Sequence, residues 1–155
     1  MIELEPKIKK ALLYIDFFKQ YEQLSNAFND ERTPDKERLE YFDGEIIMDS
    51  LTQLGYTVNF EPKEKFFKIS EEEINNYSFS ANIILRYGMV ELVWVVRENG
   101  NLILGLPIGE YSRLVIDPKY KIKKPIFGTY EDLDEIFRIS FHLFEEFKQA
   151  LVNLK

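Results

Sequence analysis

The sequence contains no cysteine and a single histidine, His142. Without cysteine the chain cannot form disulfides, thiolate metal sites or a cysteine nucleophile. A lone histidine cannot complete a metal site with a second histidine or cysteine, and a classical serine triad would have to use it as the base. On the expected C-terminal helix, His142 lies beside Arg138 and Glu145, away from the apolar stripe. We therefore predict a surface histidine, no catalytic residue, no metal site and no cofactor.

Long hydrophobic runs are absent as well. No apolar segment approaches the ~20 residues that cross a bilayer. The opening MIELEPKIKK lacks the basic-then-apolar order of a signal peptide. Together with the lack of cysteine, these features predict a cytoplasmic protein that does not bind membranes.

Motifs that identify an enzyme are missing. No serine lies in a G-x-S-x-G turn. The segment Gly105–Tyr111, GLPIGEY, resembles a phosphate-binding loop, but no Lys-Ser/Thr pair follows it and we expect no helix after it. Among the 27 acidic residues, nothing singles out the pair that glycoside hydrolysis needs. The sequence thus favours a protein that works without catalysis.

The net charge is −7, and basic residues gather in only one place. The segment 117–125 carries four lysines and one acid, which we interpret as a solvated loop. The acids lie mainly on the expected helices. Because an acidic surface repels phosphate backbones, direct binding of nucleic acid is disfavoured.

What the sequence does contain is enough apolar material for a folded core. Hydrophobic residues make up 45% and aromatic residues 15% of its 155 positions. These fractions are typical of folded rather than disordered chains. A chain of this length is usually one domain, so we predict a single α+β domain over residues 1–155.

Three consecutive runs between Phe79 and Val115 predict an antiparallel meander. Residues 79–87 alternate between apolar and polar side chains, and residues 90–97 alternate after a turn. Asn99-Gly100 is a strong signal for a hairpin into the third run. Pro107 interrupts this third strand, which favours a position at the edge of the sheet.

The middle strand of this meander carries Val93 and Val95 on the face opposite Trp94. Apolar residues on both faces are typical of a strand that other elements cover on both sides. We therefore predict a central strand with structure packed against each of its faces.

Apolar residues at helical spacing predict three helices. The first covers residues 6–28, and the second covers residues 33–55 with a possible break at Asp43-Gly44. The third covers residues 129–154 and begins with an N-capping threonine.

Between the second helix and the meander we predict two short strands, at residues 56–60 and 65–69. A helical turn should follow over residues 71–76, because Ser70 and Glu73 have the spacing of a capping box. The fold class is α+β: an antiparallel sheet of four to five strands with a central three-strand meander, two N-terminal helices and one C-terminal helix packed on it. The core should include Trp94, Ile83, Leu104, Ile15 and Phe141.

Two groups of acids are candidates for binding a basic partner protein. One lies around the possible helix break and the other lies just before the meander. Their members are Asp43, Glu45, Asp49, Glu71, Glu72 and Glu73. The alternative interpretation is an acidic surface that only keeps the protein in solution.

In size, acidity and mixed α+β order, the chain resembles the small immunity proteins encoded beside bacterial secreted toxins. The resemblance implies a function without catalysis, in which the protein binds a cognate toxin and blocks its active site or its substrate. An acidic surface suits a basic nuclease toxin, because it imitates the phosphate that it displaces.

Two alternatives remain open. One is a small-ligand-binding protein or enzyme with a cone-shaped curved sheet, like the nuclear-transport-factor-like fold, in which Tyr87, Trp94 and Tyr111 would line a pocket. The other is a self-associating adaptor domain that uses the second face of the sheet, so that a homodimer is possible.

Overall fold

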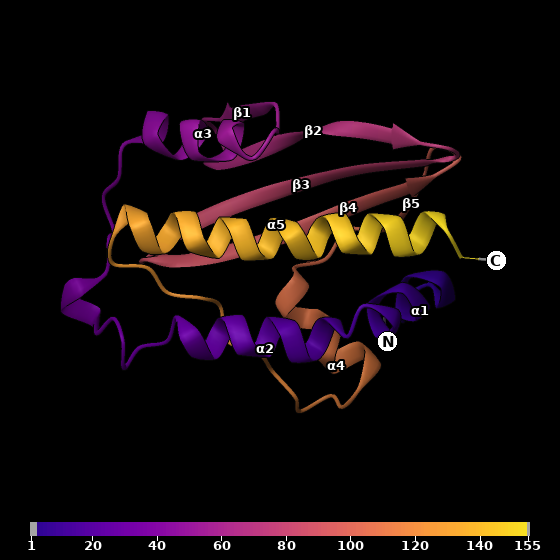
Figure 1. Cartoon of the computed structure of the whole chain (residues 1–155), viewed down its shortest axis with the longest axis horizontal. Coiled ribbons are helices and arrows are strands. Elements are labelled where there is room, and N and C mark those ends of the chain that lie inside the picture. Colours follow the sequence, from indigo (N-terminus) through magenta and orange to yellow (C-terminus); the bar gives the residue numbers. More distant parts are fainter. Residues whose placement is uncertain (1–2, 155) are drawn as a thin grey trace.

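A five-stranded antiparallel sheet with α5 along one face is the centre of the computed structural model, which describes residues 3–154 (Figure 1). The helices are α1 (Pro6–Tyr14), α2 (Phe17–Ala27), α3 (Gly44–Gln53), α4 (Tyr111–Val115) and α5 (Tyr130–Val152), with 3-10 turns η1 (Asp35–Glu37) and η2 (Ile108–Glu110). The strands follow chain order across the sheet: β1 (Val58–Glu61), β2 (Phe66–Ile74), β3 (Tyr77–Arg86), β4 (Met89–Glu98) and β5 (Asn101–Leu104). The predicted α+β class and its meander are confirmed.

The face of the sheet beneath α5 holds the core. Along β4, side chains alternate between a buried row and a half-buried row, and Trp94 lies in the buried row. Its indole contacts Phe147 of α5 and Phe17 of α2, with ring centroids 4.9 and 5.4 Å away. The residues predicted for the core are all buried: Trp94, Ile83, Leu104, Ile15 and Phe141.

The other face of the sheet is only half covered. Val93 and Val95 are half-buried there, so the prediction that both faces of this strand are covered is wrong within residues 3–154. The aromatic contacts of α2, α4 and α5 with β4 are made on the face of Trp94. We call the second face the open face. Its side chains include those of Phe66, Lys68, Glu71, Glu73, Ser78, Ser80, Asn82, Ile84, Glu91, Val93, Val95, Arg97 and Leu102.

The first predicted helix is in fact two helices, α1 and α2. Between them Asp16 adopts a left-handed conformation with φ of 55°. Aspartate tolerates this region better than most residues, because its short polar side chain can bond locally. The break lets α2 take a direction of its own and brings Phe17 to the core. Leu13 and Tyr14, at the end of α1, remain exposed.

The second predicted helix forms only in its later half. Residues 38–42 are not helical, and α3 begins at Gly44. Asp43 is the N-cap, and its carboxylate accepts a 2.9 Å hydrogen bond from the Glu45 N–H. The Leu39 N–H donates to the Phe127 carbonyl oxygen at 3.1 Å. This segment is therefore held by a distant part of the chain, which overrides its local helical spacing.

The predicted helical turn over residues 71–76 is wrong, because β2 continues through it. Glu72 and Glu73 pair with β3 in antiparallel register. A bulge between Ile69 and Glu72 inserts an extra residue into β2. Glu71 in this bulge lies 3.8 Å from Arg97 of the open face. Long-range strand pairing thus decides the conformation of a segment for which the capping-box pattern indicated a helix.

The third run of the meander is shorter than predicted. β5 ends at Leu104 but does form the edge of the sheet, and beyond it Pro107 makes a single bridge to Val93. Contrary to expectation, a helix follows the segment Gly105–Tyr111, namely the five-residue α4.

α5 begins where predicted. The Thr129 hydroxyl accepts a hydrogen bond from the Asp132 N–H at 3.0 Å, and acids occupy the first turn, where the helix dipole favours them. Within residues 3–154, no helix combines the length and the apolar character that crossing a membrane requires.

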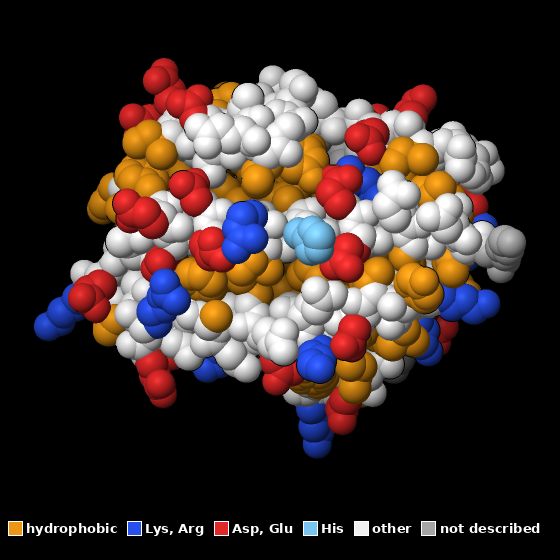
Figure 2. Space-filling model, viewed as in Figure 1, with side chains coloured by type: hydrophobic (Ala, Val, Ile, Leu, Met, Phe, Trp, Pro, Cys, Tyr) orange, Lys and Arg blue, Asp and Glu red, His pale blue; other side chains and the backbone are white. Residues whose placement is uncertain are grey.

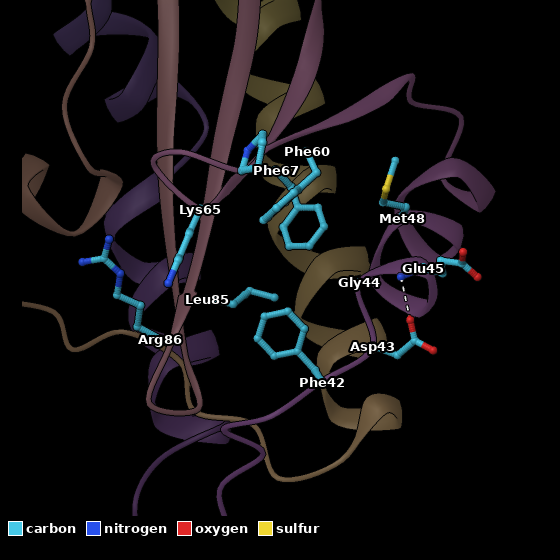
Figure 3. Close-up of a pocket in the computed structure, with 11 residues that line it drawn as sticks. Phe42, Asp43, Gly44, Glu45, Met48, Phe60, Lys65, Phe67, Leu85 and Arg86 are labelled. Atoms are coloured by element: carbon cyan, nitrogen blue, oxygen red, sulfur yellow. Dashed lines mark hydrogen bonds between the residues drawn. The ribbon is translucent and has the colours of Figure 1, made fainter.

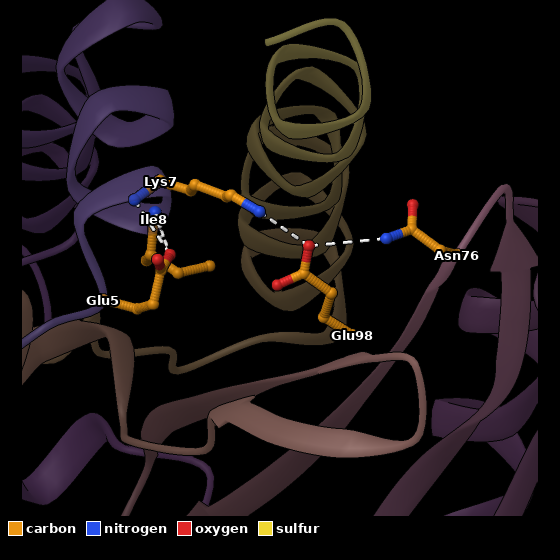
Figure 4. Close-up of polar contacts among 5 residues, drawn as sticks. All are labelled: Glu5, Lys7, Ile8, Asn76 and Glu98. Carbon is orange, nitrogen blue, oxygen red and sulfur yellow. Dashed lines mark hydrogen bonds and ion pairs between the residues drawn. The ribbon is translucent and has the colours of Figure 1, made fainter. Parts of the chain in front are cut away.

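An ion pair fastens α1 to the end of β4. Lys7 Nζ donates to Glu98 Oε2 at 2.7 Å, and Asn76 Nδ2 donates to the same oxygen at 3.4 Å (Figure 4). Glu5 caps α1 by accepting from the N–H groups of Lys7 and Ile8. The hydrogen bond from Lys7 lowers the pKa of Glu98, and the same bond raises the pKa of Lys7.

Replacing Trp94 tests whether the core depends on this side chain. Trp94→Ala should lower the free energy of unfolding by about 3–5 kcal/mol, because it leaves a large cavity beneath α5. Urea denaturation measures the change. Tyr14→Ala is the matched control, since Tyr14 is 81% exposed and should change stability by no more than about 0.5 kcal/mol. Equal losses for both variants would contradict this packing.

The Lys7–Glu98 pair predicts a pH dependence of stability. Because the pKa of folded Glu98 lies below its usual value of 4.5, the pair stabilises the fold above that value. This contribution is lost as the pH falls through the lowered pKa. Glu98→Gln should therefore be less stable than the wild type at neutral pH, and the difference should shrink at about pH 3. Urea titrations at both pH values measure it.

The control for this experiment is Glu64→Gln, since Glu64 is exposed and makes no ion pair within residues 3–154. Its stability should track that of the wild type at both pH values. A Glu98→Gln difference that is the same at neutral and acidic pH would contradict the role of the pair.

Candidate binding site

An open apolar pocket lies on the helix-bearing face of the sheet, between α3 and the β1–β2 hairpin. Its cavity volume is about 570 Å³. Phe60, Phe67 and Leu85 come from three neighbouring strands, and Phe42 and Met48 come from the α3 side (Figure 3). This end of the sheet face therefore presents aromatic and aliphatic side chains to solvent.

The pocket exists because the second predicted helix starts late. The non-helical segment before α3 places Phe42 near Phe67, with ring centroids 6.4 Å apart. Phe67 also packs against Phe60 of β1 at 5.0 Å. Phe67 is buried, but Phe60 is 44% exposed. The aromatic row thus continues from the core to the surface, and its last member faces solvent.

Charged residues of opposite sign flank the pocket. Asp43 and Glu45 stand on the α3 side, and their carboxylates point away from the aromatic rings (Figure 3). Lys65 in the β1–β2 turn and Arg86 at the end of β3 stand on the other side. A partner protein that inserts an apolar side chain here would have acids on one side of that side chain and bases on the other.

The six predicted partner-binding acids are all exposed, but they do not form one patch. Asp43, Glu45 and Asp49 lie on or beside α3, near the pocket. Residues 71–73 lie toward the far end of β2, away from α3 (Figure 1). Glu71 is close to Arg97, and Glu72 lies 3.4 Å from Lys148. The first group is thus free to meet a partner beside the pocket, whereas two members of the second already face bases.

The sequence did not reveal the pocket itself. Its strand residue Phe60 looked like an ordinary member of an apolar row, and Phe42 was assigned to a helix. Only Asp43-Gly44 gave a local signal, because this pair predicted a possible break in the helix at this point. Lys65 and Arg86 carry no local signal, because strand pairing alone brings them to the same place.

The aromatic residues proposed to line a pocket in a cone-shaped sheet do not meet in one. Trp94 and Tyr111 are buried in the core, with ring centroids 6.0 Å apart. Tyr87 lies in the β3–β4 turn and is 68% exposed. These three residues cannot bind one ligand together.

A buried lysine connects α5 to β2. Lys148 Nζ lies 2.7 Å from Glu145 Oε2 and 3.4 Å from Glu72 Oε1, and its side chain is only 2% exposed. It also lies over the rings of Tyr56 and Phe144. The Tyr56 hydroxyl donates to Glu145, and burial together with this carboxylate raises the pKa of Tyr56. The carboxylates of Glu72 and Glu145 compensate the charge of Lys148, so we assign this side chain a structural role.

His142 lies on the exposed side of α5, as predicted (Figure 2). Its side chain is 73% exposed, and its Nε2 is 3.6 Å from Glu146. Within residues 3–154, no group of three or more histidine or acidic side chains is placed to hold a metal ion. Acids and bases are interspersed over this face of the molecule (Figure 2).

Comparisons with protein-family models, curated proteins and solved structures found no match to the chain. The arguments for its function therefore come from its own residues. The pocket beside α3 is the strongest of these features, because it combines exposed aromatic surface with charge.

Substitution of Lys148 separates its charge from its packing. Lys148→Ala should cost about 2–4 kcal/mol, because it removes both the buried stem and the counter-charge of two carboxylates. Lys148→Met keeps an apolar stem and should recover part of this loss. Thermal and urea unfolding measure both variants. If Met is no better than Ala, the stem does not contribute.

Proposed function

We propose that the chain is a non-catalytic protein-binding domain whose pocket beside α3 receives an apolar side chain of a basic partner. The observation that carries the proposal is the partly exposed aromatic floor, with Phe60 at its outer end, next to the acids of α3. Binding energy at protein interfaces is concentrated where an anchoring side chain fills such a pocket and excludes water.

Exposed apolar surface around the pocket supports this proposal. Tyr41 is 90% exposed and immediately precedes Phe42, which lines the pocket. Covering aromatic and aliphatic groups of this kind gains roughly 25 cal/mol per Å² of apolar area removed from water. A partner that covers Tyr41 and Phe60 together would gain an interface core with a charged rim, as typical interfaces have.

The acids of α3 would act mainly on the rate of association. Asp43, Glu45 and Asp49 are exposed, so water and salt screen them in the complex as well as in the free protein. Exposed charges of this kind steer an oppositely charged partner toward the site more than they hold it there. The net charge of −7 adds a field of the same sign.

An immunity protein that neutralises a bacterial toxin is the role that best fits these properties. Such a protein needs a tight contact and no turnover. A basic toxin domain would be drawn to the acidic wall, and an apolar side chain near its active site would occupy the pocket. The bound chain would then block access of the substrate to the toxin.

Binding of a small apolar ligand is the second candidate. The cavity of about 570 Å³ falls within the roughly 300–1,000 Å³ of small-molecule sites. Native mass spectrometry of the protein purified from its own source distinguishes the two. A retained small molecule favours this candidate, and a retained polypeptide favours the first.

The binding test compares two variants with the wild type in pull-downs from extracts of the source organism, followed by kinetics with the partner obtained. Phe60→Ala removes the outer aromatic group and should raise the dissociation rate at least about tenfold. Joint replacement of Asp43, Glu45 and Asp49 by lysine should slow association and weaken its dependence on salt, with less effect on dissociation.

Two controls accompany the test. His142→Ala changes a residue of α5 that does not line the pocket. Joint replacement of Lys121, Lys123 and Lys124 by alanine removes base rather than acid. Neither change should slow association. The proposal fails if the partner is acidic, if association is independent of salt, or if Phe60→Ala binds as the wild type does.

A further inference from the structure

We propose that two copies of the chain pair through the open face of the sheet, as a dimer with two-fold symmetry. This inference is independent of the pocket, which lies on the opposite face. Its starting point is the half-buried apolar row of Ile84, Val93 and Val95, which lies on the face of the sheet opposite the contacts of α2, α4 and α5 with Trp94. Apolar side chains on a sheet face are typical of a face that packs against a second sheet.

The charges on the open face of β4 are arranged symmetrically about its middle. A line across the sheet passes through Ile69, Ala81 and Trp94, which are register partners on β2, β3 and β4. Glu91 lies three residues before Trp94 and Arg97 lies three residues after it. A two-fold axis parallel to this line places each strand, reversed, over its own copy. Glu91 then faces Arg97 of the second copy.

The same axis pairs the remaining residues of β4. Val93 faces Val95 of the second copy, so the apolar centre packs on itself. The flanking ion pairs within one chain are long, at 3.6 Å for Lys124–Glu91 and 3.8 Å for Arg97–Glu71. At each end of the paired β4 strands, Lys124 and Glu91 of one copy would lie next to Arg97 and Glu71 of the other. Bases and acids would then alternate along one row.

β2 shows a second complementary pair. Lys68 is the register partner of Asn82, on one side of the line. Glu71 lies in the bulge on the other side, at the level of Ser80. Rotation about the axis brings Lys68 of one copy over Glu71 of the other. Two strands thus carry opposite charges at positions that the same operation exchanges, which an interface made from identical patches requires.

On β3 the axis brings Ser80 over Asn82 of the second copy. Ser80 is only 4% exposed and Asn82 Oδ1 is enclosed within its own chain, so neither offers a polar contact to the second copy. Ile84 lies over Ser78 of the second copy, whose small side chain leaves room for it.

Other arrangements fit the charges less well. An axis parallel to the strands would bring Glu91 near Glu91 and Arg97 near Arg97 of the second copy. The five strands are about 4.8 Å apart and four, nine, ten, ten and four residues long, so the face measures about 600 Å². Two such faces together amount to about 1,200 Å², which is at the lower end of the range for stable interfaces.

The first experiment measures the mass of the purified full chain by sedimentation equilibrium over a range of concentrations. The wild type should be a dimer, and Val95→Lys should be a monomer, because it places two charges in the apolar centre. Leu13→Lys is the control, since Leu13 is 53% exposed on α1 and away from the open face; it should remain dimeric. A monomeric wild type, or a dimer that survives Val95→Lys, overturns the proposal.

A charge exchange tests the axis itself. Glu91→Arg and Arg97→Glu alone should each raise the dissociation constant of the dimer about tenfold or more, because like charges then meet. The double variant should regain most of the affinity. Within one chain the exchange sets a base beside Lys124 and an acid beside Glu71, so the recovery can only come from contacts between copies. A double variant that dimerises no better than the single ones overturns the geometry.

Discussion

The burial of Trp94 is the constraint on which the rest of the structure depends. Its indole lies where β4 passes beneath α5 and α2, in contact with Phe144, Phe147 and Phe17. To bring Phe17 to this point, the N-terminal segment must turn at Asp16. To enclose the other side, the chain after β5 must return and place Tyr111 against the same ring system. One aromatic centre thus accounts for the helix break and for the short helix α4.

The pocket lies at the end of the sheet that is far from Trp94. α5 covers the middle of the sheet and the strands near Trp94, whereas β1 and the start of β2 lie beside α3 (Figure 1). α3 is short because distant contacts hold the segment before it. Phe60 and Phe42 therefore continue the aromatic core without being fully enclosed. An exposed aromatic row at the end of a well-packed core presents a binding surface on a rigid support.

The sequence predicted the elements whose signals are local. The meander has its own hairpin turn at Asn99-Gly100 and α5 has its own cap at Thr129, so the first two strands of the meander and α5 are found close to their predicted bounds. The errors lie where a distant segment decides. The capping-box pattern at Ser70 is overridden by pairing of β2 with β3, and the helical spacing near Leu39 is overridden by a hydrogen bond with Phe127. The acids of α3 were visible in the sequence, but the pocket beside them was not, because its residues come from separate elements.

Val93 and Val95 make the second face of β4 apolar, as expected for a strand with both faces covered. A single chain, however, covers only one of these faces in the part that the structure describes. The pattern predicts that both faces of β4 are covered, and within residues 3–154 one face is not. A face that evolved only to meet water would be expected to carry polar side chains, as the outer positions of antiparallel sheets commonly do. Here apolar residues occupy its middle, and charges of opposite sign stand at the two ends of one strand. Such an arrangement is explained if the missing layer is the same face of a second molecule.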